Sequence, residues 1–184
     1  MIVPLALAVL QSSTPVPQGT PTQSSLGGTF VNPFTPALDI GVMPGRMLQI
    51  TMNFPGQTWQ EEFVLGIPRR VRYPAPVLTL FHGYGEEPAQ VVQNTALVQD
   101  AMARGWVVYI PLGAHKFNYG IEYAQRNIEL SFEFLGSRLP LDLDRIYAVG
   151  FSMGGGAAAS YAARHLDPEG VRFAAVVGHA GAAS

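Results

Sequence analysis

From about residue 45 onward, apolar residues fall into short runs that alternate with stretches of helical spacing. Two runs, at 47–54 (MLQITMNF) and 62–67, flank Pro55-Gly56-Gln57, a composition typical of turns, so they predict an antiparallel strand pair. Four later runs show little polar alternation, which predicts strands buried on both faces. They lie at 77–81 (VLTLF), 106–111 (WVVYIP), 145–149 (RIYAV) and 173–177 (FAAVV).

Helical spacing separates these strands. Pro88 stands where a first-turn proline is favoured, and residues 91, 95, 98 and 102 follow at helical intervals before Gly105, which predicts one helix. The segment 121–135 has one apolar face, and the alanine-rich segment 155–165 follows the third buried run. This alternation predicts crossover units in a mostly parallel sheet with helices on both faces, which is a three-layer α/β/α sandwich. Ligands of such sheets bind at the carboxyl ends of the strands.

The first 44 residues lack this pattern. Residues 2–10 (IVPLALAVL) are apolar enough for the core of a signal peptide and too few to cross a bilayer as a helix. No Lys or Arg precedes the run, so a flexible tail stays open as the alternative, and the expected location is secreted or periplasmic, otherwise cytoplasmic. Residues 11–28 are rich in Ser, Thr, Pro, Gln and Gly, which predicts a linker. We therefore divide the chain into 1–28 (signal segment and linker), 29–44 (irregular lead-in) and 45–184 (one domain).

Composition narrows the function classes. Eleven basic and thirteen acidic residues leave a net charge of −2, so the chain lacks the positive charge expected of proteins that bind nucleic acid or anionic membranes. The chain has no cysteine, which excludes disulfides, thiolate metal sites and cysteine nucleophiles.

One motif carries candidate chemistry. Gly150-Phe151-Ser152-Met153-Gly154 matches G-x-S-x-G and stands between a predicted buried strand and a predicted helix, the context that the motif requires. A sharp strand-to-helix turn would present the Ser152 hydroxyl above the sheet edge, because flanking glycines let strand and helix approach closely. The amide of Met153, at the helix N-terminus, would then face a developing oxyanion.

A second oxyanion donor should come from the loop after an earlier buried strand. That position holds His82-Gly83-Tyr84-Gly85, and we assign the donor role to the backbone N–H of Tyr84 rather than to its phenol. His82 is interpreted as a structural histidine bonded to its own loop. Two motifs at the ends of two predicted neighbouring strands are more specific than either motif alone.

The strings FHGYG and DRIYAVGFSMGGGAA resemble the α/β-hydrolase superfamily, particularly its polyhydroxybutyrate depolymerase, feruloyl esterase and prolyl-oligopeptidase-like branch. The resemblance covers about residues 45–184. It implies a serine carboxylesterase that cleaves a small-molecule or polymeric ester through an acyl-enzyme on Ser152, without cofactor or metal. A serine peptidase or acyltransferase on the same fold, and a non-catalytic hydrolase-like binding domain, stay open as alternatives.

The resemblance also implies a triad order of nucleophile, acid and histidine, with the last two after two further strands. After Ser152 the chain offers only Asp167, Glu169, His165 and His179, and none stands in a family position. Asp142 and Asp144 precede a strand and are interpreted as turn and capping residues at the opposite end of the sheet. We therefore expect a fold truncated after about the sixth strand, with esterase activity in a full-length form and none in residues 1–184 alone.

Overall fold

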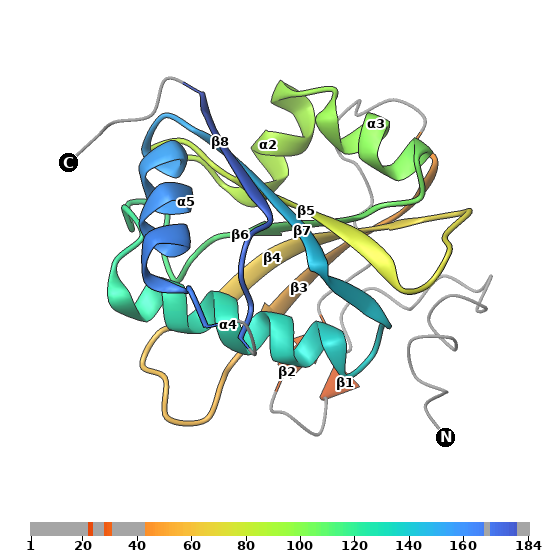
Figure 1. Ribbon diagram of the computed structural model, residues 1–184. Coiled ribbons are helices and arrows are strands. Elements are labelled where there is room, and N and C mark those ends of the chain that lie inside the picture. The colour runs from red at the N-terminus through yellow and green to blue at the C-terminus, as the bar shows by residue number, and fades with distance from the viewer. Residues whose placement is uncertain (1–21, 24–27, 31–42, 168–169, 180–184) are drawn as a thin grey trace.

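The computed structural model describes residues 22–23, 28–30, 43–167 and 170–179. The proposed signal segment, most of the proposed linker and most of the lead-in lie outside these residues. Within them, no helix has the length and apolar character needed to cross a bilayer. The described strands form one sheet in the order β1-β2-β3-β4-β6-β5-β7-β8, shown in Figure 1.

Antiparallel strands make one side of this sheet. β3 (Gly45–Met52) pairs with β4 (Glu61–Pro68) over eight residue pairs, as the sequence predicts. In the connecting turn, Gln57 N donates to Phe54 O at 3.1 Å, and Gly56 has a φ of 76°, a conformation that favours glycine. β1 (Thr22–Gln23) and β2 (Gly28–Phe30) extend this side, and the sequence analysis predicts neither of these strands.

The other side of the sheet carries the parallel strands. β6 (Val107–Pro111), β5 (Ala75–Phe81), β7 (Leu141–Phe151) and β8 (Ala175–His179) run parallel to one another, and β4 pairs with β6 antiparallel. All seven residues of β5 are buried, which explains its uninterrupted apolar sequence. β8 begins two residues later than the sequence predicts.

β7 begins four residues earlier than predicted, so Asp142 and Asp144 lie within the strand instead of in a turn before it. Ala75 at the start of β5 pairs with Leu141, which extends the ladder beyond the apolar part of β7. There Asp142 forms an ion pair with Arg145, N···O 2.7 Å, and accepts a hydrogen bond from the Asp144 amide. Both acids remain at the end of β7 opposite to Ser152, as expected.

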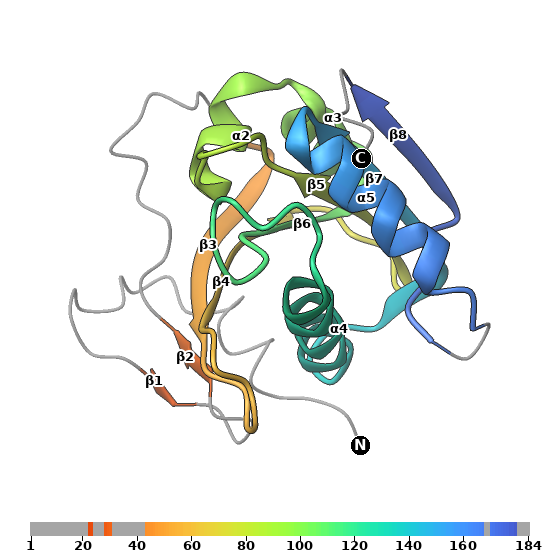
Figure 2. The same ribbon diagram turned by 90° about the vertical axis from the view of Figure 1, so that its left-hand side faces the viewer.

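Helices cover both faces of the sheet (Figures 1 and 2). α2 (Pro88–Asn94) and α3 (Leu97–Ala103) pack on one face, where they share an apolar cluster with residues of β4, β5 and β6. α4 (Glu122–Gly136) and α5 (Met153–Arg164) pack on the other face, in a larger cluster that includes Phe132 and Tyr161. The three-layer α/β/α prediction is confirmed.

The single helix predicted over residues 88–102 is wrong, because two helices form there. Thr95 is extended, with φ −145° and ψ 143°, and its hydroxyl oxygen accepts a hydrogen bond from the Leu97 amide at 3.2 Å. A threonine hydroxyl offers the backbone this local alternative to the helical hydrogen bond. The break redirects the chain, so that Val91 of α2 and Val98 of α3 are both buried against the sheet.

Candidate active site

Ser152 occupies the turn between β7 and α5. Its backbone has a φ of 50° and a ψ of −117°, a conformation that costs a non-glycine residue about 1–3 kcal/mol. The turn is held on both sides, because the Ser152 amide donates to the His179 carbonyl and its own carbonyl accepts from Gly155, both at 2.9 Å. The residue is exposed. The predicted geometry of an exposed serine between a strand and a helix is therefore present.

The two glycines of the motif make this turn possible. A methyl group at Gly150 would lie 2.6 Å from the Gly155 nitrogen, and one at Gly154 would lie 2.5 Å from the His82 carbonyl oxygen. Real Cβ atoms do not approach backbone atoms this closely. The first turn of α5 therefore packs directly on the end of β7 and on the loop that follows β5.

That second loop carries Tyr84. Phe81, the last residue of β5, is the register partner of Gly150 in β7, so the two loops start side by side. The Gly83 amide donates to the Glu86 carboxylate at 2.8 Å, and the Glu86 amide donates to the Gly83 carbonyl at 3.2 Å. Within the described part of the chain, the amides of Tyr84 and Met153 have no hydrogen-bond acceptor. Among the described residues, these two unbonded donors lie beside Ser152, one on the loop after β5 and one at the start of α5.

The side chain of Tyr84 points into solvent and is 60% exposed. Its ring contacts those of Phe117 and Tyr119, with centroid distances of 4.8 and 5.9 Å. Phe117 and Tyr119 belong to the loop after β6, and both are also exposed. An aromatic surface of three side chains therefore borders the candidate site.

His82 lies beneath this loop and is 2% exposed. Its Nδ1 lies 2.7 Å from the Gly83 carbonyl oxygen and its Nε2 lies 2.9 Å from the Leu112 carbonyl oxygen. Both ring nitrogens are thus engaged with backbone, and neither is available to Ser152. The interpretation of His82 as a structural histidine is confirmed.

The loop from Leu112 to Gly120 is held from inside by two buried polar side chains, of which sequence reasoning missed Glu61. Asn118 is buried, and its Nδ2 donates to the carbonyls of Leu112 and His115 at 2.8 and 2.9 Å. Glu61, the first residue of β4, is fully buried and accepts hydrogen bonds from the amides of Gly113 and Ala114. From the sequence, an acid next to a turn is expected to be exposed, and no local signal predicts its burial.

The Glu61 carboxyl has an unusually high pKa. Burial raises its pKa from 4.5 to about 7, although hydrogen bonds from Gly113, Ala114, Asn127 and Leu112 favour the charged form and limit the rise. Of the residues facing it, Tyr109 of β6 is titratable, and burial together with the charge of Glu61 raises the pKa of that phenol.

We expect the protein to lose stability as the pH rises towards neutrality. The native state keeps the Glu61 proton up to a pKa of about 7, whereas the unfolded chain releases it near 4.5. The resulting contribution to the free energy of unfolding is fully present below pH 4.5 and is lost as the pH rises past 7. It amounts to roughly 3 kcal/mol. Urea unfolding across this range measures it, and Glu61→Gln should flatten the profile. An equally steep profile in the variant would show that another group is responsible.

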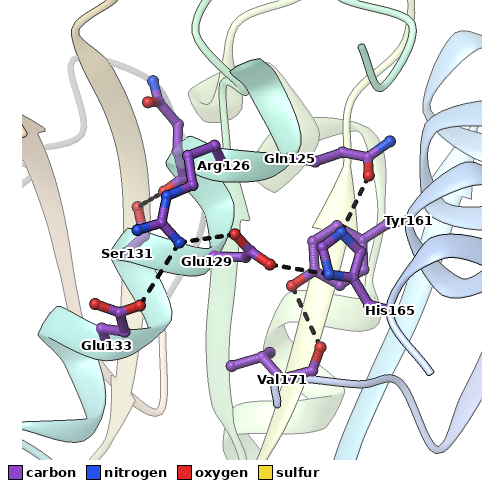
Figure 3. Close-up of polar contacts among 9 residues, drawn as sticks. Gln125, Arg126, Glu129, Ser131, Glu133, Tyr161, His165 and Val171 are labelled. Carbon is purple, nitrogen blue, oxygen red and sulfur yellow. Dashed lines mark hydrogen bonds and ion pairs between the residues drawn. The ribbon is translucent and has the colours of Figure 1, made fainter. Parts of the chain in front are cut away.

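The side chains of the two histidines after Ser152 have other partners. His179 ends β8, and its ring contacts that of Phe151 with a centroid distance of 6.0 Å. His165 caps the far end of α5, where its ring stacks on Tyr161 and its nitrogens face Glu129 and Gln125 of α4, each at 3.0 Å (Figure 3). Glu169 lies outside the described residues. In the part of the chain that the structure describes, no histidine ring hydrogen-bonds to the Ser152 hydroxyl.

His165 belongs to a network that reaches the loop after β6. Gln125 donates through Nε2 to the Gly120 carbonyl and to Ser160 Oγ, so its carbonyl oxygen is left to accept from the His165 ring. Glu129 lies 3.0 Å from the other ring nitrogen and also pairs with Arg126. The network joins α4 to α5 and fixes the end of the loop. Among the described residues, no cluster of three or more His, Cys, Asp or Glu side chains is arranged to hold a metal ion.

Comparison with known proteins shows which solved structures share this architecture. No curated protein sequence matches the chain. Similar solved structures include a fluorophosphonate-binding serine hydrolase of Staphylococcus aureus, with a TM-score of 0.60 and 18% identity over 72% of this chain and 56% of that one. An S-formylglutathione hydrolase of Agrobacterium tumefaciens gives a TM-score of 0.63 and 18% identity over 77% and 60%. A ferulic acid esterase of Anaeromyces mucronatus gives 0.58 and 14% over 78% and 62%.

These identities support a shared fold, and the chain spans 56–62% of the length of the three neighbours. The sequence profile of the family described as alpha/beta hydrolase fold matches residues 76–181, which is more than half of the chain. The match includes β5 with the Tyr84 loop and β7 with the Ser152 turn, the two segments that carry the resemblance. The chain therefore belongs to the α/β-hydrolase fold family.

Proposed function

We propose that this chain is the nucleophile-bearing part of a serine carboxylesterase and that Ser152 forms the acyl-enzyme. The observation that carries the proposal is the turn itself. A serine held at a φ of 50° between a strand and a helix, and exposed to solvent, has the arrangement of a nucleophile elbow, which presents the hydroxyl to a substrate. Strain of this kind persists only where the surrounding structure enforces it, as the hydrogen bonds of the Ser152 backbone to His179 and Gly155 do here.

In the proposed reaction, Ser152 Oγ attacks the acyl carbon while a base takes its proton. The carbonyl oxygen gains negative charge and is stabilised by the amides of Met153 and Tyr84, which form the oxyanion hole. Met153 is the first residue of α5, so the positive end of the helix dipole acts on the same oxygen. The alcohol leaves with a proton returned by the base, and water then hydrolyses the acyl-enzyme.

The base and its orienting acid are further parts of the proposal. Neither His165 nor His179 reaches the Ser152 hydroxyl, so we expect a histidine and an acid from outside the described residues. The exposed rings of Tyr84, Phe117 and Tyr119 support an ester with an apolar or planar portion, either small or part of a polymer. The printed names of two structural neighbours, a hydrolase and an esterase, support the same reaction class.

A fluorophosphonate probe tests the proposal directly. In the full-length protein we expect one covalent adduct, on Ser152, detected by mass spectrometry of the labelled peptide. Tyr84→Phe is a matched control, because it removes a hydroxyl beside the site and keeps the proposed amide donor, so its labelling rate should stay within about threefold of the parent, a difference below 1 kcal/mol. An adduct on another serine, or labelling that persists in Ser152→Ala, would refute the assignment of the nucleophile.

A further inference from the structure

We propose that the ionised carboxylate of Glu61 is a positioning residue for hydrolysis, which holds the loop from Leu112 to Gly120 so that this loop in turn fixes the Tyr84 amide. The inference rests on the proposed function and adds a residue that does not touch the substrate. Glu61 comes from β4, on the antiparallel side of the sheet, and its carboxyl lies beneath the loop that borders the candidate site.

The partners of the Glu61 carboxyl group are N–H donors, which favour its charged form. Oε1 accepts from Gly113 N at 2.9 Å, and Oε2 accepts from Ala114 N at 2.7 Å and from Asn127 Nδ2 at 3.2 Å. Gly113 and Ala114 have φ values of 68° and 70°, and both of their amides point at the Glu61 carboxylate. These three bonds tie the carboxylate to the loop after β6 and to α4.

The braced loop contacts the Tyr84 loop directly. Lys116 accepts a hydrogen bond at its carbonyl oxygen from the Gly85 amide, 2.9 Å away, and its ammonium group pairs with Glu87 at 3.5 Å. The Phe117 ring packs on that of Tyr84. At its other end the loop lies against α5, since a methyl group at Gly120 would be 2.8 Å from Ala157 Cα. The loop thus bridges the two elements that carry the proposed oxyanion donors.

The charge state of Glu61 changes near neutral pH. Its pKa is about 7, and within the described residues no Lys or Arg pairs with it. The groups that face it are the loop amides, Asn127 of α4 and the phenol of Tyr109 in β6. Protonation removes the charge from the hydrogen bonds to Gly113 and Ala114, and charge-assisted bonds are roughly twice as strong as neutral ones. The loop from Leu112 to Gly120 should therefore be well ordered above this pKa and more mobile below it.

The test is the ratio of the activities of Glu61→Gln and wild type as a function of pH, in the full-length protein. The catalytic base is common to both, so its titration cancels in the ratio. About two pH units above 7 we expect the variant to lose about 100-fold in kcat with little change in KM, because a misplaced donor weakens transition-state binding. About two units below 7 the wild type is itself protonated, and the ratio should approach one.

Glu62→Gln is the matched control. Glu62 is the next residue of β4 and its side chain bonds to Gln49, so this variant should keep a ratio near one at every pH. Asn127→Ala gives an independent measurement, since loss of a donor raises the pKa of Glu61 and should move the pH midpoint of activity upward. Asn127→Ala still tests the inference in case Glu61→Gln fails to fold, as judged by circular dichroism.

A Glu61→Gln ratio that is constant with pH, or an unmoved midpoint in Asn127→Ala, would overturn the inference. Failure of the proposed function is distinguishable, because it appears as activity that survives Ser152→Ala. A pH-independent ratio together with activity that depends on Ser152 would refute the role of Glu61 alone.

Discussion

Ser152→Ala in the full-length protein should lower kcat for p-nitrophenyl acetate by about a millionfold, the usual cost of removing the nucleophile of a serine hydrolase. The residual rate would come from the oxyanion donors and from substrate binding, which act without the nucleophile. Binding should change little, because the hydroxyl is a small part of the site. Initial rates corrected for spontaneous hydrolysis measure the effect, and the same variant separates carboxylesterase activity from a non-catalytic binding domain.

Ser160→Ala is the matched control for this prediction. Ser160 lies on the same helix, α5, and its oxygen accepts a hydrogen bond from Gln125 at 3.2 Å, away from the turn at Ser152. Its removal should leave kcat within about threefold of wild type, since it touches no proposed catalytic group. Turnover that survives Ser152→Ala would end the serine-esterase proposal. Loss of turnover in the Ser160 variant would place the chemistry elsewhere on α5.

Gly154→Ala should both abolish activity and destabilise the fold, by about 3 kcal/mol or more. The added methyl group would lie 2.5 Å from the His82 carbonyl oxygen, and a backbone atom cannot swing aside as a side chain can. Relief requires α5 to move away from the end of β5, which separates the Met153 amide from the Tyr84 loop. Urea unfolding and ester hydrolysis measure the two losses on the same protein.

Gly136→Ala is the control for the glycine effect. Gly136 is the last residue of α4, and an added methyl group would meet no atom within 4 Å. Because alanine is the better helix former, stability should stay constant or rise by up to about 1 kcal/mol, with activity unchanged. A Gly154→Ala protein as stable and as active as the parent would mean that strand and helix do not need their close approach.

The sequence alone predicts the main architecture and the Ser152 turn. Uninterrupted apolar runs such as 77–81 specify buried strands because burial on both faces leaves no polar alternation, and the glycines at 150 and 154 specify a turn because only glycine fits a close approach. These are local properties, so the order of residues alone is enough to predict the turn at Ser152.

Other features are missed by the sequence pattern, most of them because they depend on contacts between distant segments. The break at Thr95 has a local cause, a hydroxyl that competes with a helical hydrogen bond, yet the apolar spacing across it still reads as one helix. The extension of β7 to Leu141 needs Ala75 as its partner, and the link between His165 and Glu129 needs α4 beside α5.

Glu61 is the clearest case of a residue whose role the sequence alone does not predict. In the sequence it is an acid beside a turn, and only the pairing of β4 with β6 brings it under the amides of Gly113 and Ala114, more than fifty positions away. The sequence by itself determined the strands, the helical faces and the serine turn, since each follows from side-chain patterns and steric limits within a few residues. The tertiary structure decided which polar groups become buried together, because desolvation and hydrogen bonding depend on neighbours that only the completed fold supplies.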